Sequence, residues 1–268
     1  VLLAAHGEIA TAPDGHGGML AALAKHVGFE TLQRRGIDLL FYGQIDNPLL
    51  TVCDPEFLGY HLLAGSELTT QVVRKVLPEE RVGVVAQIDG HLEIMEYSDL
   101  SPADAARRRD DGTLELWAGN TAVHAFDVAF LKAVSQNAHV ALPLHLAKKK
   151  VPFVDSQGTL VEPTEPNAIK FERFIFDLLR LAKRALVVEV DRAVAFAPVK
   201  NAAGAASDTA EIAQAAMLAF DRALLNTAGV QLSAGVRVEI NPNFALDAEE
   251  LARRLPPGTR INQDTYLL

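Results

Sequence analysis

The chain has 268 residues, 49% of them apolar, and a formal net charge of -9. This apolar content is enough for one large domain core with a smaller appended lobe. The negative charge argues against a general nucleic-acid or anionic-membrane surface, because either partner would need an extended basic face. We therefore expect a globular protein in which any anionic substrate meets a locally basic site.

Three further features of the sequence bear on its class. No run approaches the roughly 18 consecutive apolar residues of a membrane helix, which predicts a soluble protein. The lone Cys53 excludes an internal disulfide and fits a reducing cytoplasm. Val1 to Ala5 is too short an apolar run for a signal peptide and lacks a basic flank. Because the first residue is Val1 rather than methionine, we interpret the chain as trimmed at its start.

Strand-like and helix-like stretches alternate along most of the chain, which indicates an α/β fold. The glycine-rich run Pro13 to Gly18 precedes a helical stretch from Met19 to about Val27. Backbone amides in such a loop can face a ligand's anionic groups, and an ordinary tight turn is the alternative.

A buried strand is expected from Asp38 to Ile45, followed by the polar residues Asp46 and Asn47. In open α/β sheets ligands bind at the carboxyl edge of the strands. The Asp46 carboxylate could therefore hold a hard divalent cation, since magnesium at phosphate substrates usually has one or two carboxylate ligands. The alternative is an aspartate that stabilises a turn or caps a helix.

Next in the chain, Val82–Ile88 and His91–Tyr97 alternate apolar and polar residues around an Asp89-Gly90 turn, the strongest hairpin signal in the sequence. The second arm of this hairpin carries Glu96. Ser101-Pro102 then begins a short polar helix that runs to about Arg109.

The middle of the chain contains a basic run and a predicted helix. Lys148 to Lys150 is interpreted as a solvated helix end, and no role is assigned to it. Eight histidines, among them His139 and His145, show no spacing typical of a zinc site. Asn167 is expected to cap a helix whose apolar residues recur at three- and four-residue spacing. These apolar residues are Phe171, Phe174, Ile175, Leu178, Leu181 and Ala182.

A strand is predicted from Ala185 to Val190 and an alanine-rich helix from Thr209 to about Thr227. The small polar residues from Asn201 to Ser207 indicate a mobile loop between them. Lys170 and Lys200 lie in apolar-rich surroundings, where they could neutralise the charge of a triphosphate. The alternative for both is an ordinary surface lysine.

Beyond Gly229 the pattern weakens to short strands, a helix near Asp247–Leu255 and a Pro256-Pro257-Gly258 turn. We predict a first unit over residues 1–228 and the start of a smaller α+β lobe over residues 229–268.

Several short blocks occur in an order and spacing that together are specific. They are Pro13 to Gly18; Gln44-Ile45-Asp46-Asn47 with Asp54-Pro55 and Phe57-Leu58-Gly59; Glu96-Tyr97-Ser98-Asp99-Leu100; Ala118-Gly119-Asn120 with His124; Pro166-Asn167-Ala168-Ile169-Lys170 with Phe174 and Phe176-Asp177; and Phe196-Ala197-Pro198-Val199-Lys200-Asn201. With these blocks the chain resembles the eukaryotic-type UDP-N-acetylglucosamine pyrophosphorylases, within the UDP-sugar pyrophosphorylases. The resemblance covers most of the chain. It implies the nucleotide-diphospho-sugar transferase fold, a Rossmann-like mixed sheet with flanking helices.

The resemblance also implies a role for each matching residue. Gly15 matches a glycine that contacts the uridine nucleotide, and His16 matches the next residue, which touches the sugar. Asp46 matches an aspartate beside the phosphates and a magnesium ion, and Lys170 and Lys200 match two phosphate-side lysines. The remaining matches are substrate-binding positions around the sugar. These are Gly83, Glu96, Tyr97, Asn120, His124 and Phe174.

The sequence departs from the family pattern in two places. Position 16 is usually asparagine, and a histidine there is bulkier and can titrate, which makes the sugar preference less certain. The family's glycine-rich nucleotide loop would precede Pro13, and no segment of this chain matches it. The resemblance thus implies an N-terminally truncated catalytic domain, which we expect to bind sugar nucleotide weakly and to catalyse poorly on its own.

The activity that the resemblance implies is transfer of a uridylyl group in the cytoplasm. A sugar 1-phosphate attacks the α-phosphate of UTP in line, giving UDP-N-acetylglucosamine and pyrophosphate. A UDP-glucose, UDP-galactose or broad-range pyrophosphorylase is the alternative within enzymes, and a non-catalytic module or fragment that binds sugar nucleotides is the alternative outside them. The expected partners are UTP, a sugar 1-phosphate and the UDP-sugar, with neither nucleic acid nor membrane, and the oligomeric state is left open.

Overall fold

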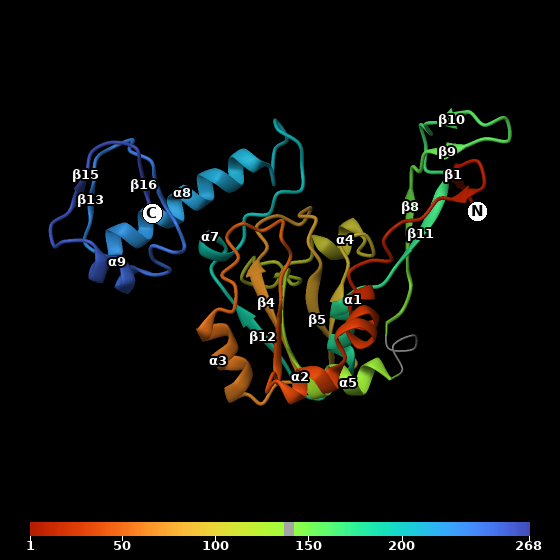
Figure 1. The fold of residues 1–268 in the computed structure, drawn as a ribbon, viewed down its shortest axis with the longest axis horizontal. Helices are drawn as coiled ribbons and strands as arrows, with labels where there is room; N and C mark the ends of the chain where they lie inside the picture. The colour runs from red at the N-terminus through yellow and green to blue at the C-terminus, as the bar shows by residue number, and fades with distance from the viewer. Residues whose placement is uncertain (137–141) are drawn as a thin grey trace.

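The computed structural model of the protein describes residues 1–136 and 142–268, so His139 lies outside the described residues. Figure 1 shows a central body in which helices pack on a sheet, with a narrow β arm on one side and the C-terminal lobe on the other. Within the described residues, no helix has both the length and the apolar content needed to cross a membrane.

The central sheet is mixed, and its strands are ordered β12-β4-β7-β5-β6, with β3 also paired to β7. Its described strands are β3 (Leu39–Tyr42), β4 (Leu68–Arg74), β5 (Val84–Ile88), β6 (His91–Met95), β7 (Ala118–Asp127) and β12 (Ala185–Glu189). Only β12 and β4 are parallel, while β7 runs antiparallel to each strand beside it. The α/β fold and the mixed sheet expected from the sequence are thus confirmed.

Strand β7 has two different neighbours along one of its edges. Near its start, Gly119 pairs with Val84 of β5, and from His124 onward it pairs with β3. On the other edge, the pairing with β4 shifts register between Thr70 and Val72. The residues of β7 from Thr121 to Val123 therefore lie between its pairing with β5 and its pairing with β3.

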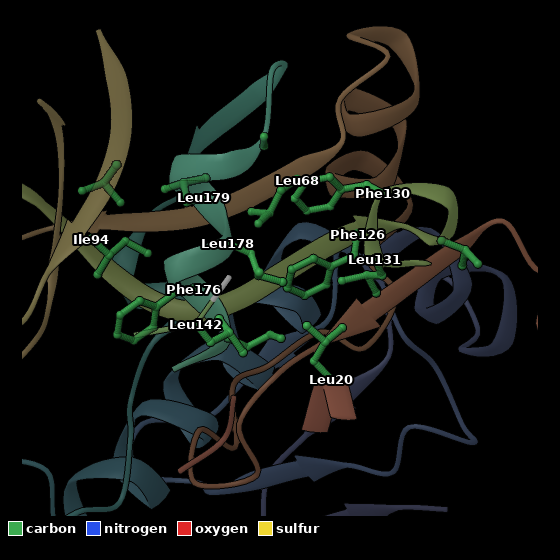
Figure 2. Close-up of a cluster of buried hydrophobic side chains, with 14 of the residues drawn as sticks. Leu20, Leu68, Ile94, Phe126, Phe130, Leu131, Leu142, Phe176, Leu178 and Leu179 are labelled. Atoms are coloured by element: carbon green, nitrogen blue, oxygen red, sulfur yellow. The ribbon is translucent and has the colours of Figure 1, made fainter. Parts of the chain in front are cut away.

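Helices cover both faces of this sheet. One face is covered by α1 (Gly18–Ala22), the π-helical turn η1 (Leu23–Val27), α2 (Phe29–Arg34), α5 (Val128–Ser135) and the 3-10 helix η2 (Ile175–Leu181). Figure 2 shows the main core on this side, with Leu20, Phe126, Leu131 and Leu178 packed together. On the opposite face, α3 (Pro55–Leu63) buries Phe57 against the alternate β7 residues Val123 and Ala125. The period of two along β7 assigns its residues to these two cores.

The expected hairpin is confirmed, since β5 and β6 pair around Asp89 and Gly90, which have φ angles of 50° and 85°. Two left-handed residues in succession are what a two-residue hairpin turn requires. The helix after Ser101 is shorter than expected, because α4 ends at Ala105 (Pro102–Ala105).

The arm corrects the helix predicted after Asn167. Residues Ala168–Glu172 form strand β11, which pairs antiparallel with β8 (His145–Lys149), and Asn167 instead bonds the backbone of Val151. Only the apolar residues from Ile175 to Leu181 lie in a helix, which is the 3-10 helix η2. Lys148 and Lys149 are consequently part of a β ribbon rather than a helix end, and Lys150 directly follows it. The short strands at the arm's outer end are β1 (Leu3–Ala5), β2 (Glu8–Ile9), β9 (Phe153–Val154) and β10 (Leu160–Val161).

Helix α8 (Ala210–Thr227) leads from the body to the C-terminal lobe (Figure 1). Its first part packs on Leu49 through Ala213, and Leu225 near its end enters a separate buried cluster. That second core holds Leu251 of α9 (Ala248–Arg254) and the strand pairs β13–β15 and β14–β16. Those strands are β13 (Gln231–Leu232), β14 (Val238–Ile240), β15 (Arg260–Ile261) and β16 (Thr265–Leu267). The boundary placed at residue 228 stays a prediction.

Candidate functional site

Asp46 and Lys200 lie on two backbone segments that are hydrogen-bonded to each other. The loop after β3 lies against the segment that follows α7 (Arg192–Ala195), and the Val199 N–H donates to the Asp46 carbonyl at 2.8 Å. Asn47 strengthens this junction, because its Nδ2 donates to the Ala195 carbonyl at 2.8 Å and its Oδ1 accepts from the Ala197 N–H at 3.0 Å. Two residues expected on the phosphate side, far apart in sequence, thus come from adjoining backbone segments.

Lys200 also begins a loop whose two ends are tied together. The N–H groups of Lys200 and Asn201 donate to the Asp208 carbonyl at 2.8 and 2.9 Å. The Asn201 side chain donates to the Ser207 carbonyl at 2.9 Å. Asp208 has a φ of 54°, a left-handed conformation that aspartate tolerates better than most residues. These bonds fix the Lys200 backbone at the neck of the segment that the sequence indicated as a loop.

Gly83, Glu96 and Asn120 form a second group, at the open end of the β5–β6 hairpin. The Asn120 N–H donates to the Gly83 carbonyl at 2.8 Å. A Cβ on Gly83 would lie 3.2 Å from Glu96 Oε1 and 3.0 Å from Ile94 Cγ2, so glycine leaves room for the carboxylate. Burial raises the pKa of Glu96 and Asp99 adds to the rise, while the charges of His145 and Lys200 lower it. Lys200 therefore lies within electrostatic reach of this second group.

The Asn120 side chain has both a structural bond and a free donor. Its Oδ1 accepts from the Ala122 N–H at 3.0 Å and from Thr70 Oγ1 at 3.4 Å. Ala122 has a φ of 57°, so this amide stabilises a strained bulge in β7. Within the described residues, Asn120 Nδ2 makes no hydrogen bond and can donate to a ligand.

His16 lies in a group of aromatic rings. Its Nδ1 accepts from the Ile175 N–H at 3.1 Å, and its ring lies 5.1 Å from that of Phe174 and 6.0 Å from that of Tyr42. Burial lowers the pKa of His16 to about 4, so the ring is neutral near pH 7. With Nδ1 accepting, the proton is on Nε2, and His16 presents one fixed N–H donor.

The glycines on either side of His16 are required by a close backbone approach. The Gly17 N–H donates to the Arg173 carbonyl and the Arg173 N–H donates to the Asp14 carbonyl, each at 2.7 Å. A Cβ on Gly17 would lie 2.7 Å from the Arg173 carbonyl carbon, and Gly15 has a φ of 84°. The loop is therefore clamped to the residue after β11, which positions His16 against Phe174.

His124 lies beneath this ring group rather than on its surface. It is fully buried on β7, its ring is 5.7 Å from that of Tyr42, and neither ring nitrogen has a hydrogen-bond partner among the described residues. Burial lowers its pKa to about 3. Its expected contact with a substrate would therefore have to be indirect, through Tyr42.

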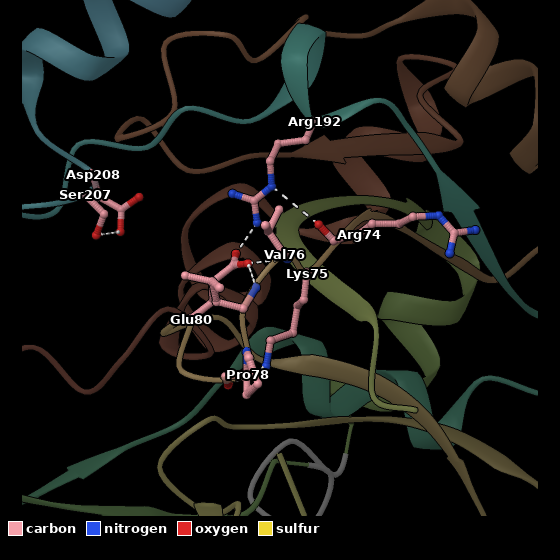
Figure 3. A network of polar contacts seen from close by, with 9 residues as sticks. Arg74, Lys75, Val76, Pro78, Glu80, Arg192, Ser207 and Asp208 are labelled. Carbon is pink, nitrogen blue, oxygen red and sulfur yellow. Dashed lines mark hydrogen bonds and ion pairs between the residues drawn. The ribbon is translucent and has the colours of Figure 1, made fainter. Parts of the chain in front are cut away.

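Tyr97 lines a cavity of about 190 Å³ together with Lys75 and Glu80, and Glu96 is not among the residues that line it. Lys75 is buried and donates to the Pro78 carbonyl at 3.1 Å, and burial lowers its pKa. Figure 3 shows how Glu80 binds both the Val76 N–H and the Arg192 guanidinium. This network ties the segment leading to Gly83 to the start of α7.

Lys170 is on the arm, where its Nζ pairs with Glu172 at 2.8 Å. None of its described polar contacts reaches Asp46 or Lys200. The charge of Glu172 acts on His16 and raises the His16 pKa against the effect of burial, so the base of the arm is near the ring group. A cavity of about 560 Å³ along the free edge of β12 contains none of the expected site residues.

Three further residues join the site that spacing rules did not identify. Tyr42 lies between His16 and His124, and His145 Nε2 lies 2.8 Å from Asp177 Oδ2. Zinc spacing was an unsuitable test for His145, whose partner is an aspartate distant in sequence. The one available signal was Asp177, which follows Phe176 in a block that matches the family pattern.

Among the described residues, no group of three or more histidine, cysteine or carboxylate side chains could enclose a metal ion. A lone Asp46 carboxylate is still the donor set of an ion shared with phosphate oxygens and water, which is the usual arrangement for magnesium. The residues present therefore fit a magnesium ion that arrives with a nucleotide, and they do not fit a cage made of protein ligands alone.

The chain is similar to known proteins over most of its length. Residues 4–245 match the model of the family described as UTP--glucose-1-phosphate uridylyltransferase. The chain is 44% identical over 218 residues to UDP-N-acetylhexosamine pyrophosphorylase-like protein 1 of Homo sapiens, covering 81% of this chain and 43% of that protein. It is 36% identical over 249 residues to UDP-N-acetylglucosamine pyrophosphorylase of Saccharomyces cerevisiae, covering 92% and 52%.

Solved structures give the same result. A putative UDP-N-acetylglucosamine pyrophosphorylase from Entamoeba histolytica superposes with a TM-score of 0.89 at 28% identity, covering 100% of this chain and 66% of that one. The enzyme from Trypanosoma brucei, solved with an inhibitor, gives 0.78 at 27% identity, covering 98% and 58%. The chain spans about half the length of the curated relatives it matches.

Proposed function

We propose that this chain carries the sugar and phosphate side of an enzyme that makes UDP-N-acetylglucosamine. The chain belongs to the UTP--glucose-1-phosphate uridylyltransferase family. The substrates are UTP and N-acetylglucosamine 1-phosphate, and the second product is pyrophosphate. Relatives named for this reaction match over most of the chain, which supports the choice. The lone Cys53 supports a cytoplasmic location, where thiols stay reduced.

In the proposed reaction a phosphate oxygen of the sugar 1-phosphate forms a bond to the α-phosphorus of UTP. The bond from that phosphorus to the oxygen bridging it to the β-phosphate breaks, and pyrophosphate leaves with the electron pair. The attacking oxygen is already ionised, so no side chain needs to remove a proton. The chain's contribution is positioning and neutralisation of charge, which can supply most of the rate enhancement in phosphoryl and nucleotidyl transfer.

The single observation that carries this proposal is the bond between Val199 N–H and the Asp46 carbonyl. It joins the backbone next to Lys200 to the backbone of Asp46, and the charge of Lys200 acts on Glu96. A phosphate-binding cation and a hydroxyl-binding carboxylate are thus within reach of one ligand. Glu96 would accept from sugar hydroxyls, and Asn120 Nδ2 would donate to the N-acetyl carbonyl.

Asp46 would hold magnesium, and Lys170 would be a second cation on the phosphate side. A bound magnesium ion supplies neutralisation of phosphate charge. Lys170 pairs with Glu172 in this structure, so we infer that a phosphate would compete with Glu172 for its ammonium.

Calorimetric titration of this chain with UDP-N-acetylglucosamine and magnesium tests the proposal. Glu96→Gln should weaken binding by roughly 10-fold or more, because hydrogen bonds to charged groups contribute about 1.5–3 kcal/mol. Glu93→Gln is the matched control, since Glu93 lies on β6, which ends just before Glu96, and its carboxylate pairs with Arg180. Absence of binding by a folded wild-type sample would overturn the proposal for this chain.

UTP alone should bind more weakly, because no segment of this chain matches the family's nucleotide loop. Catalysis is best measured on a longer protein, as formation of UDP-sugar from UTP.

A preference for glucose 1-phosphate is the second candidate, because the matching family model is named for that substrate. In the longer protein, competition between the two sugar 1-phosphates separates the two assignments. A higher kcat/KM for glucose 1-phosphate would reject the N-acetylglucosamine assignment and retain the reaction type.

A further inference from the structure

His145 and Asp177 form a pair that the proposed reaction does not use. Their side chains are 28% and 13% exposed, and Nε2 lies 2.8 Å from Oδ2. A histidine oriented by an aspartate is the arrangement that many enzymes use for proton abstraction. Because the attacking phosphate oxygen needs no base, the pair must serve another purpose.

The Asp177 carboxylate fixes which ring nitrogen of His145 carries the proton. A carboxylate accepts hydrogen bonds, so Nε2 is the donor to Asp177 Oδ2. In the neutral ring, Nδ1 then has a free lone pair and acts as an acceptor. Within the described residues, Nδ1 makes no hydrogen bond.

The ring of His145 faces the site rather than the outer side of the arm. In the β8–β11 ribbon His145 lies opposite Glu172, on the same side as Lys170, while Leu146 and Phe171 are on the other side and are exposed. Its ring centroid lies 4.6 Å from that of Phe174, and Phe174 also contacts His16.

The polar groups around this position form a complementary set. His16 Nε2 and Asn120 Nδ2 are donors, whereas Glu96 is an acceptor whose carboxylate is within electrostatic reach of His145. A hexose offers several hydroxyls that each donate once, so a second acceptor would add discrimination that Glu96 alone does not provide.

We propose that His145 is a specificity-determining residue whose Nδ1 accepts a hydrogen bond from a hydroxyl of the bound sugar, and that Asp177 is its positioning residue. The inference rests on the proposed function. The competing explanation is that the pair only fastens the arm to η2.

Two substitutions of His145 separate these explanations. Glutamine can place an amide N–H near the position of Nε2, which keeps the bond to Asp177 and removes the acceptor. Asparagine can place its amide oxygen near the position of Nδ1, which keeps the acceptor and removes the bond to Asp177. In calorimetry with UDP-N-acetylglucosamine, His145→Gln should lose about 3- to 10-fold in affinity, the loss expected for one hydrogen bond, and His145→Asn should lose less. The reverse order would overturn the assignment in favour of a structural tether.

Deoxy analogues of UDP-N-acetylglucosamine identify the hydroxyl. The wild-type chain should bind one of the 3-, 4- and 6-deoxy analogues more weakly than the parent compound, and His145→Gln should bind that analogue as well as the parent. Equal losses in both proteins for every analogue would mean that no hydroxyl is coupled to His145, and would overturn the assignment. Thermal unfolding of both variants establishes that the comparison is made on folded protein.

The tautomer is a separate measurement that needs no ligand. Nitrogen-15 NMR of the histidine ring should show Nε2 protonated and Nδ1 unprotonated, and Asp177→Asn should weaken this preference. A proton on Nδ1 in the wild-type chain would overturn the inference. If the wild-type chain fails to bind any sugar nucleotide, the proposed function fails and this inference fails with it. If the wild-type chain binds the sugar nucleotide but His145→Gln and His145→Asn bind it equally well, only the proposed role of His145 is rejected.

Discussion

His124 should make the stability of this protein depend on pH, because it is buried without a hydrogen-bond partner in the described structure. Its pKa is about 3 in the folded state against 6.5 for an ordinary histidine. Between these pH values the unfolded chain binds a proton that the folded chain does not. The free energy of unfolding therefore falls as the pH falls, by up to about 1.4 kcal/mol per pH unit.

The size of the effect follows from the two pKa values. From pH 7 to pH 5, His124 should remove about 2 kcal/mol from the free energy of unfolding. His16, with a folded pKa of about 4, should lower the free energy of unfolding by a similar amount, so the two histidines together lower it by roughly 4 kcal/mol. This is a large share of the 5–15 kcal/mol typical of a folded domain. Burial raises the pKa of Glu96 and Asp177, which acts in the opposite direction, since those groups favour the folded state as the pH falls.

Comparison of variants isolates the contribution of His124 from these opposing groups. Urea unfolding of His124→Phe should give a shallower loss between pH 7 and pH 5, about 2 kcal/mol less than in the wild-type chain. His124→Leu provides a second side chain that cannot titrate, in case phenylalanine packs poorly. Val123→Ala is the matched control on the same strand, because it should lower stability equally at both pH values. If both His124 variants run parallel to the wild-type curve, the burial argument is wrong.

Two other substitutions test single features of the fold. Gly17→Ala should lower the free energy of unfolding in urea by about 1–3 kcal/mol, because the new Cβ would overlap the Arg173 backbone. The control Gly59→Ala has open space around its Cβ within α3, so it should leave the free energy of unfolding unchanged or raise it. Asp247→Ala should cost about 1 kcal/mol, since Asp247 Oδ1 accepts from the Glu250 N–H at 2.8 Å at the start of α9. An unchanged unfolding midpoint for either Gly17→Ala or Asp247→Ala would contradict its explanation.

The sequence identified the elements whose pattern is local. The Asp89-Gly90 hairpin and the alanine-rich helix from Thr209 to about Thr227 both formed as predicted, because turn geometry and helix propensity act within a few residues. The helix predicted from Asn167 was wrong. Its apolar residues belong to two elements, a strand with Phe171 exposed and the 3-10 helix with Leu178 buried, and a single 3.6-residue period spans both. Periodicity alone cannot show where one element ends and the next begins.

The candidate site shows a second limit of sequence reasoning. Glu96, Asn120 and Lys200 were chosen by resemblance, and the structure brings them near one another through backbone bonds such as Asn120 N–H to the Gly83 carbonyl. No side-chain pattern encodes those bonds. These backbone bonds depend on where β7 stops pairing with β5 and starts pairing with β3, and no sequence pattern identifies that position.

The arm illustrates why these contacts matter for the proposed chemistry. A two-stranded ribbon is marginally stable by itself, so the orientation of Lys170 depends on what holds the base of β8 and β11. Two contacts do so in the structure. Arg173 is clamped to the glycine loop through Gly17, and His145 is bonded to Asp177. Both contacts also position groups that face the sugar side, namely His16 in the first and the His145 ring in the second. In the proposed site, the contacts that fix Lys170 are therefore the same ones that position His16 and His145, so a substitution at either contact should change sugar affinity and catalytic rate together.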